Sequence, residues 1–140
     1  MADGRLLGFL AIYALIGLSA GGAIALALRL TGMMRERAAM AVLLAAIAAF
    51  YPVFAAENGD LGDLALHLAI FGGFVVVAAL GYRRSSLWLA AGLIAHGLFD
   101  LAILFFASPA PLWWHPFCAA IDVSLGLWWI VHRPRDGPAA

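Results

Sequence analysis

Three pairs of chemically reactive side chains recur at a spacing of four residues in a chain that is otherwise strongly apolar. The pairs are Asp63 with His67, His96 with Asp100, and Cys118 with Asp122. Residues four apart on an α-helix lie on the same face, so each pair points in one direction. Imidazole, carboxylate and thiolate groups are the side chains that bind zinc and related ions. The spacing therefore predicts one polar cluster if the three helices pack together.

A divalent metal site is the chemistry that this set of residues favours. The charge of a divalent ion would offset carboxylates that are buried in an apolar environment. We expect His67, His96, Asp100 and Asp122 to be the metal ligands and zinc to be the ion. A bound zinc ion activates a water molecule, and Glu57 is expected to act as general base, with His96 and Asp100 as the other catalytic residues. The predicted activity is hydrolysis of a lipid-like substrate that enters between the helices.

Two other functions fit the same residues. The acids and histidines can relay protons or coordinate a cation in transit, which would make the chain a transport or channel subunit. Five spans enclose little space, so this function requires a homo-oligomer, with Gly17 and Gly21 or Gly72 and Gly73 as contact faces. The third function is that of an accessory subunit of a larger membrane complex, in which the polar cluster only fixes helix packing.

Several other classes of protein are excluded. A formal net charge of zero argues against a nucleic-acid partner. The absence of lysine excludes a lysine Schiff base. Cys118 is the only cysteine, so it forms no intramolecular disulfide, and we expect it to behave as a small buried apolar residue. His115 is expected to be a loop residue beside Trp114. The sequence contains no nucleophile elbow, zincin motif, Walker loop, dinucleotide fingerprint or haem attachment motif.

The elements that must position these residues are membrane spans. Of the 140 residues, 66% are hydrophobic and 11% are charged, with a mean hydropathy of +1.01. Soluble domains are about 45–50% apolar and about 25% charged. We therefore expect an all-α bundle of about five transmembrane helices in contact with the lipid bilayer, forming a single domain over residues 1–131. The predicted spans cover residues 6–30, 38–56, 64–82, 87–106 and 115–131.

Prolines and tryptophans predict the irregular segments. Pro52 predicts a kink in the second span. Residues 107–116 hold three prolines and two tryptophans, which predicts an ordered loop at the membrane interface. The last apolar run, residues 117–131, is short, and the tryptophans at both of its ends extend it enough to cross. Asp63 is suited to cap the third helix.

The arginines predict the orientation. All eight basic residues are arginine, and in a five-span arrangement seven of them fall on one side and Arg5 on the other. Loops rich in arginine stay in the cytoplasm. The amino terminus and the turn over residues 57–63 are then outside, and residues 132–140 form a disordered cytoplasmic tail. A chain rich in Ala, Leu and Gly without lysine indicates a bacterial source with a GC-rich genome, and hence a bacterial inner membrane.

The depth of the polar residues follows from the rise of an α-helix. At about 1.5 Å per residue, Asp100 lies about 9 Å inside the outer end of its helix and His96 about 15 Å inside. Asp122 lies about 9 Å inside the start of the last helix. A carboxylate that faces lipid costs about 2–4 kcal/mol, so both acids are expected to face the interior of the bundle.

The last third of the chain carries a resemblance. The segments Ala95-His-Gly-Leu-Phe-Asp100 and Trp114-His-Pro-Phe-Cys118, followed by Asp122, resemble a small bacterial integral-membrane family of unknown function. Its pattern is A-H-x-x-x-D followed by W-x-P-x-F-C-x-x-x-D, and this chain has one residue fewer between its proline and its cysteine. More loosely, the His and Asp residues resemble intramembrane zinc hydrolases of the alkaline ceramidase and lysoplasmalogenase type. Those proteins have seven or more spans and a different ligand order.

Overall fold

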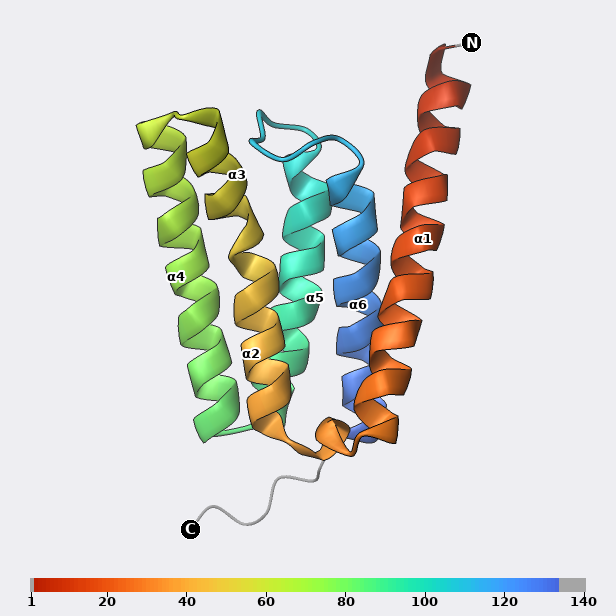
Figure 1. Ribbon diagram of the computed structural model, residues 1–140, viewed down its shortest axis with the longest axis vertical. Coiled ribbons are helices and arrows are strands. Elements are labelled where there is room, and N and C mark those ends of the chain that lie inside the picture. Colours follow the sequence, from red (N-terminus) through yellow and green to blue (C-terminus); the bar gives the residue numbers. More distant parts are fainter. Residues whose placement is uncertain (1, 134–140) are drawn as a thin grey trace.

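The computed structural model describes residues 2–133, and all regular structure in this part of the chain is helical (Figure 1). The elements are α1 (Ala2–Leu30), the 3-10 turn η1 (Met33–Arg35), α2 (Arg37–Ala48), α3 (Phe50–Asn58), α4 (Leu61–Arg83), α5 (Ser86–Ile103) and α6 (Trp114–His132). Five segments are long and apolar enough to cross a membrane, and α2 and α3 together form one of them. The predicted all-α, multi-pass membrane fold is therefore confirmed.

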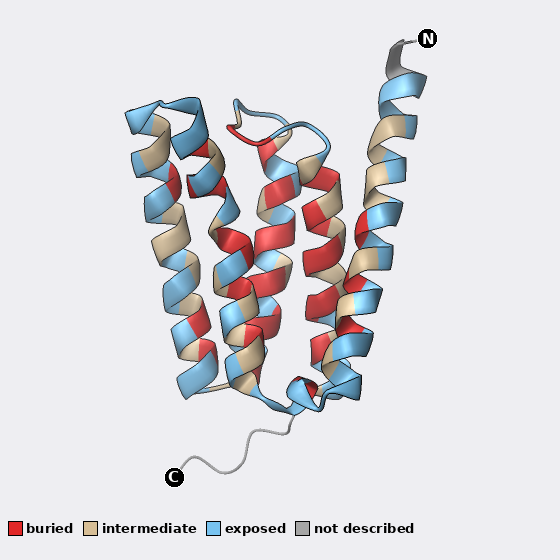
Figure 2. Cartoon of the chain, in the orientation of Figure 1, coloured by how far each residue is buried: buried red, intermediate tan, exposed pale blue. Residues whose placement is uncertain are grey.

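The outside of this bundle is more apolar than the surface of a soluble protein. Large apolar side chains such as Leu15, Val76 and Leu98 are exposed on the outside. Figure 2 shows buried residues concentrated on α5 and α6, whereas much of α1 and α4 is exposed. The buried polar residues are His67, Ser86, His96, Asp100, His115 and Asp122. These few polar residues lie within an otherwise apolar core, away from the lipid, where a polar group would be costly.

Pro52 interrupts the second span, as the sequence predicts. Helix α2 ends at Ala48 and α3 begins at Phe50. Proline has no N–H to donate to the carbonyl four residues earlier, and its ring clashes with that carbonyl. Tyr51, which directly precedes Pro52, is 2% exposed and lies inside the bundle.

The turn between α3 and α4 is closed by a glycine and an aspartate. Gly59 has φ 75°, a left-handed conformation that glycine adopts without steric cost. The Asp60 carboxylate accepts hydrogen bonds from the backbone N–H groups of Gly62 at 2.8 Å and Asp63 at 3.0 Å. The cap of α4 is therefore Asp60, and the expectation that Asp63 caps this helix is wrong. Asp63 lies instead in the first turn.

The last helix begins earlier than its apolar run. Helix α6 starts at Trp114, so His115 and Pro116 belong to its first turn and not to the preceding loop. Proline is tolerated there because the first N–H groups of a helix have no partner within the helix. The loop itself is held to the rest of the protein where the Asn58 side-chain amide donates to the Pro109 carbonyl at 3.1 Å.

Two glycines of α1 let this helix approach α6 closely. On α1, a methyl group at Gly17 would meet the Phe117 carbonyl, and one at Gly21 would meet the Ser124 hydroxyl. Gly17 and Gly21 therefore pack against α6 of the same chain. They leave no free surface for the predicted contact between copies. On α4, by contrast, Gly72 and Gly73 have nothing within 4 Å in the described structure.

The two ends of the bundle differ in charge. The amino-terminal end of α1, the α3–α4 turn and the loop between α5 and α6 lie at one end, and η1 and the α4–α5 turn lie at the other (Figure 1). The second end, which we call the arginine end, carries the arginines at positions 29, 35, 37, 83, 84 and 133. Arg135 and the rest of the predicted tail beyond residue 133 lie outside the described residues. Arg5 is near the opposite end, on α1.

Candidate metal centre

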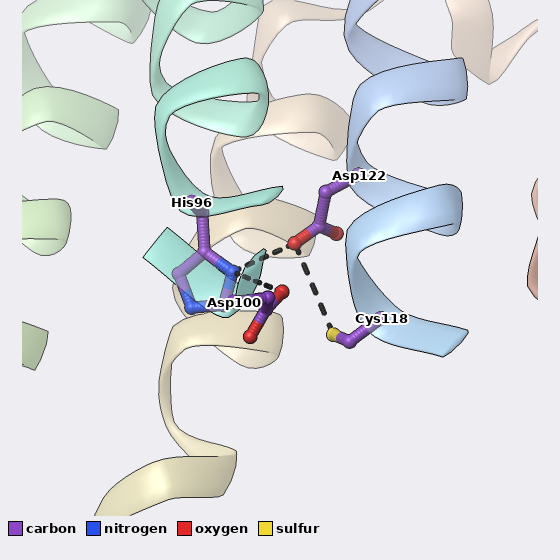
Figure 3. A group of neighbouring side chains, drawn as sticks. All are labelled: His96, Asp100, Cys118 and Asp122. Atoms are coloured by element: carbon purple, nitrogen blue, oxygen red, sulfur yellow. Dashed lines mark hydrogen bonds and ion pairs between the residues drawn. The ribbon is translucent and has the colours of Figure 1, made fainter. Parts of the chain in front are cut away.

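Helices α5 and α6 bring four candidate ligands together. His96 and Asp100 lie one turn apart on α5, and Cys118 and Asp122 lie one turn apart on α6 (Figure 3). One ligand atom from each residue lies within 4.8 Å of the others. None of the four residues is more than 3% exposed. We call these four residues the metal centre, because a group of this kind can hold a metal ion.

His96 contacts both carboxylates of the metal centre. Its Nδ1 atom is 2.7 Å from Asp122 Oδ2 and 3.5 Å from Asp100 Oδ2. The Cys118 sulfur is 3.9 Å from Asp122 Oδ2. Tetrahedral zinc places its ligand atoms about 3.3 to 3.6 Å apart, as the usual zinc–ligand bond lengths require. The two longer separations are close to that range, and the shortest is a hydrogen bond that metal binding would replace.

The charges in the centre balance only if a proton or a further cation is present. Asp100 and Asp122 are both 0% exposed, and His96 is the ion-pair partner of both. With both acids ionised, even a protonated His96 leaves one excess negative charge in a buried site, which a proton on one carboxyl would remove. A divalent cation with two carboxylates and a neutral imidazole makes the site neutral.

Two carboxylate oxygens are also left without a hydrogen bond. Within the described residues, Asp100 Oδ2 and Asp122 Oδ1 are buried atoms with no hydrogen-bond partner. Buried acceptors are normally paired, because an unpaired one costs about 1–3 kcal/mol. These oxygens are available to an ion, which is consistent with a metal site.

A hydrogen-bonded chain leads away from the centre through Tyr51. The Tyr51 hydroxyl donates to Asp100 Oδ1 at 2.6 Å, and its oxygen lies 2.9 Å from His115 Nδ1. Because the hydroxyl has one hydrogen, the second contact requires His115 Nδ1–H to be the donor. Polar contacts thus run from His115 through Tyr51, Asp100 and His96 to Asp122.

Three of the four predicted ligands lie in the centre, and the structure places the fourth beside it. His67 is buried on α4, where its ring stacks on Tyr51 with centroids 5.4 Å apart. Cys118 occupies the fourth place in the group of ligand atoms. The predicted general base, Glu57, is exposed near the end of α3 and does not belong to this group.

Two members of this network, Tyr51 and His115, were not predicted from the sequence. Tyr51 received no role, although a phenol hydroxyl next to Pro52 in an apolar span was a signal that it needs a partner. His115 was expected in a loop, but it is a buried residue of α6. Cys118 was expected to be small and buried, which is correct, and its spacing from Asp122 was the signal for its place in the centre.

An apolar cavity reaches the centre from the side. It has a volume of about 280 Å³ and lies between α1, α2, α3 and α6. Its lining includes Ile24, Ile47, Phe50, Phe117 and the centre residue Cys118. Cys118 therefore belongs both to the metal centre and to the wall of this apolar cavity.

The fold and the centre together define a class of protein. The chain is a multi-pass membrane protein with five membrane-spanning helices and a buried His/Asp/Cys cluster that can bind a metal ion. Comparisons with protein-family models, curated proteins and solved structures give no match.

Proposed function

We propose that the chain is a metal-dependent membrane enzyme that carries out hydrolase-like chemistry on a lipid-like substrate. The observation that carries this proposal is the convergence of His96, Asp100, Cys118 and Asp122, with ligand atoms within 4.8 Å of one another and two fully buried acids whose charge a divalent cation would offset. His96, Asp100 and Asp122 are the three protein ligands of a divalent ion, for which zinc suits the donor set. When bound, zinc would supply an activated water.

The surroundings of the centre support each further part of the proposal. The apolar cavity that reaches Cys118 suits an acyl chain, because the substrate of a site at this depth arrives from the bilayer. Tyr51 and His115 lead from Asp100 to the first turn of α6, and so provide a path for a proton that leaves the centre. Glu57, the general base predicted from the sequence, is exposed and lies outside the group of candidate ligands.

Metal analysis of the protein purified in detergent tests this function. The expected result is about one zinc ion per chain, because the described residues form one group of candidate ligands. A wild-type protein that contains no transition metal after growth with added zinc, and takes none up after purification, would exclude the proposal.

Cys118→Ala distinguishes a catalytic site from a structural one. Catalytic zinc sites use three protein ligands, whereas structural sites are closed by four. We expect the variant to retain zinc, with an affinity within about threefold of the wild type, because His96, Asp100 and Asp122 remain. Competition with a fluorescent chelator measures the affinity. A variant that no longer binds zinc would identify Cys118 as a fourth ligand and would contradict the enzyme proposal.

A second candidate function is proton or cation transport, and the chain of hydrogen bonds and ion pairs from His115 to Asp122 favours it. Tyr51→Phe removes the hydroxyl that joins His115 to Asp100, so proton flux into liposomes should fall at least about tenfold. Tyr82→Phe is the matched control, because Tyr82 is an exposed tyrosine near the arginine end. Equal flux in the two variants would remove this candidate.

We further propose that the arginine end faces the cytoplasm of a bacterial inner membrane. Six described arginines at that end, against Arg5 near the other, support this orientation. A cysteine introduced at Asn58, in a Cys118→Ala background, should react with an impermeant maleimide added to intact cells. Labelling that requires permeabilised cells would reverse the orientation.

A further inference from the structure

A second cavity lies between α4 and α5, next to the metal centre but outside it. Its volume is about 320 Å³. Its wall combines two polar residues, Asp63 and His67, with apolar side chains that include Leu66, Phe99 and Ile103. Both polar residues belong to the first two turns of α4, so the polar part of the wall is at one end. A cavity of this kind suits a ligand with a polar head and an apolar chain.

His67 provides independent evidence for a ligand in this cavity. Its side chain forms part of the wall, yet the residue is only 2% exposed. Within the described part of the chain, its Nδ1 atom has no hydrogen-bond partner. Tyr51 covers the imidazole by stacking, with ring planes 16° apart, and so separates it from the metal centre. A ligand group that bonds to Nδ1 would remove the cost of an unpaired buried atom.

The charge at this end of the bundle favours a cationic head group. Glu57, Asp60 and Asp63 follow one another through the α3–α4 turn. No basic residue other than His67 occurs between Arg37, which begins α2, and Arg83, which ends α4, and both arginines belong to the arginine end. The cavity therefore opens beside three acids. At that end of the bundle, α3 and α4 carry no arginine.

We infer that this cavity binds a single-chain amphiphile whose head is a primary ammonium group. The ammonium group pairs with the Asp63 carboxylate and donates a hydrogen bond to His67 Nδ1, which is an acceptor in one neutral tautomer. The alkyl chain lies along Leu66, Phe99 and Ile103. An alcohol would leave the Asp63 charge unpaired, and a carboxylate would be repelled by it. None of the four metal-centre residues takes part, so this binding does not depend on the proposed enzyme activity.

The test uses the full chain in nanodiscs of zwitterionic lipid and a twelve-carbon alkylamine with a photoreactive diazirine near the amine. We expect saturable cross-linking to residues 61–70 and 99–107, located by mass spectrometry. Dodecylamine should compete at concentrations about tenfold lower than dodecanol, a difference of about 1.4 kcal/mol. Dodecanoate should not compete. Equal competition by all three compounds, or cross-links spread evenly over the lipid-facing helices, would overturn the inference.

Variants make the assignment specific to the cavity. Asp63→Asn should weaken competition by dodecylamine about tenfold, whereas Glu36→Gln removes the same charge at the arginine end and should change nothing. Ala102→Phe fills the cavity from an exposed position and should abolish the cross-links. Full binding by either the Asp63 or the Ala102 variant would contradict the inference. Cross-linking that persists in Asp100→Asn would show that this site is separate from the metal centre, whatever the metal analysis gives.

Discussion

His96→Ala is expected to remove zinc from the purified protein and to lower its zinc affinity more than about 100-fold. Loss of a group that only orients a ligand already costs about 10–100-fold, and His96 is the one nitrogen ligand of the centre. The variant also leaves Asp100 and Asp122 without their shared ion-pair partner. We therefore expect a loss of stability of about 3–5 kcal/mol, the usual cost of breaking a buried pair.

The control for this variant is His132→Ala. His132 is an exposed histidine at the end of α6, so its removal tests for zinc bound loosely by surface imidazoles. Elemental analysis and chelator competition should give wild-type values for this control. If His96→Ala retained its zinc while His132→Ala lost it, the zinc would be bound at His132 and not at the four residues of the metal centre.

Asp100→Asn separates a metal site from a purely structural clamp, even if His96→Ala fails to fold. The new amide oxygen can still accept the hydrogen bond from Tyr51, while one of two buried negative charges disappears. A metal site predicts that this variant loses zinc and that its metal-free form is at least as stable as the metal-free wild type. Thermal unfolding in detergent, with and without zinc, measures both. Clear destabilisation without any dependence on zinc would indicate a clamp.

Gly97→Ala is expected to force α5 and α6 apart and to weaken the metal centre from outside it. A methyl carbon at Gly97 would lie 2.8 Å from Val123 Cγ2 and 3.0 Å from the Ala119 carbonyl oxygen. The backbone oxygen cannot rotate away, so the helices must shift. Overpacking of this kind costs about 1–3 kcal/mol. Because His96 precedes Gly97 directly, we expect zinc affinity to fall at least about tenfold as well, which corresponds to about 1.4 kcal/mol.

The matched control is Gly73→Ala on α4. Gly73 is also a glycine within a helix, but a methyl group there would meet nothing within 4 Å. Alanine favours the helix by about 0.5–1 kcal/mol over glycine, so this variant should be as stable as the wild type or slightly more stable. Equal unfolding temperatures and zinc affinities for the two variants would contradict the close approach of α5 and α6 at Gly97.

The sequence by itself determined the elements and the faces of the helices. Backbone groups in a bilayer must be satisfied within each span, so long apolar runs become helices wherever they occur. The break near Pro52 is equally local, since it follows from a missing N–H. Four-residue spacing likewise placed His96 with Asp100, and Cys118 with Asp122, on common faces.

Only the tertiary structure decided which of these faces meet. The approach of α5 to α6 depends on small residues such as Gly97, whose partners Ala119 and Val123 are distant in sequence. This packing put Cys118 into the metal centre, whereas His67 on α4 came to lie against Tyr51. Helix rotation and neighbour choice inside a membrane are set by van der Waals fit and by hydrogen bonds between helices, and not by hydrophobicity, because the lipid is as apolar as the side chains. Hydrophobic pattern therefore identifies the spans but carries little information about their partners.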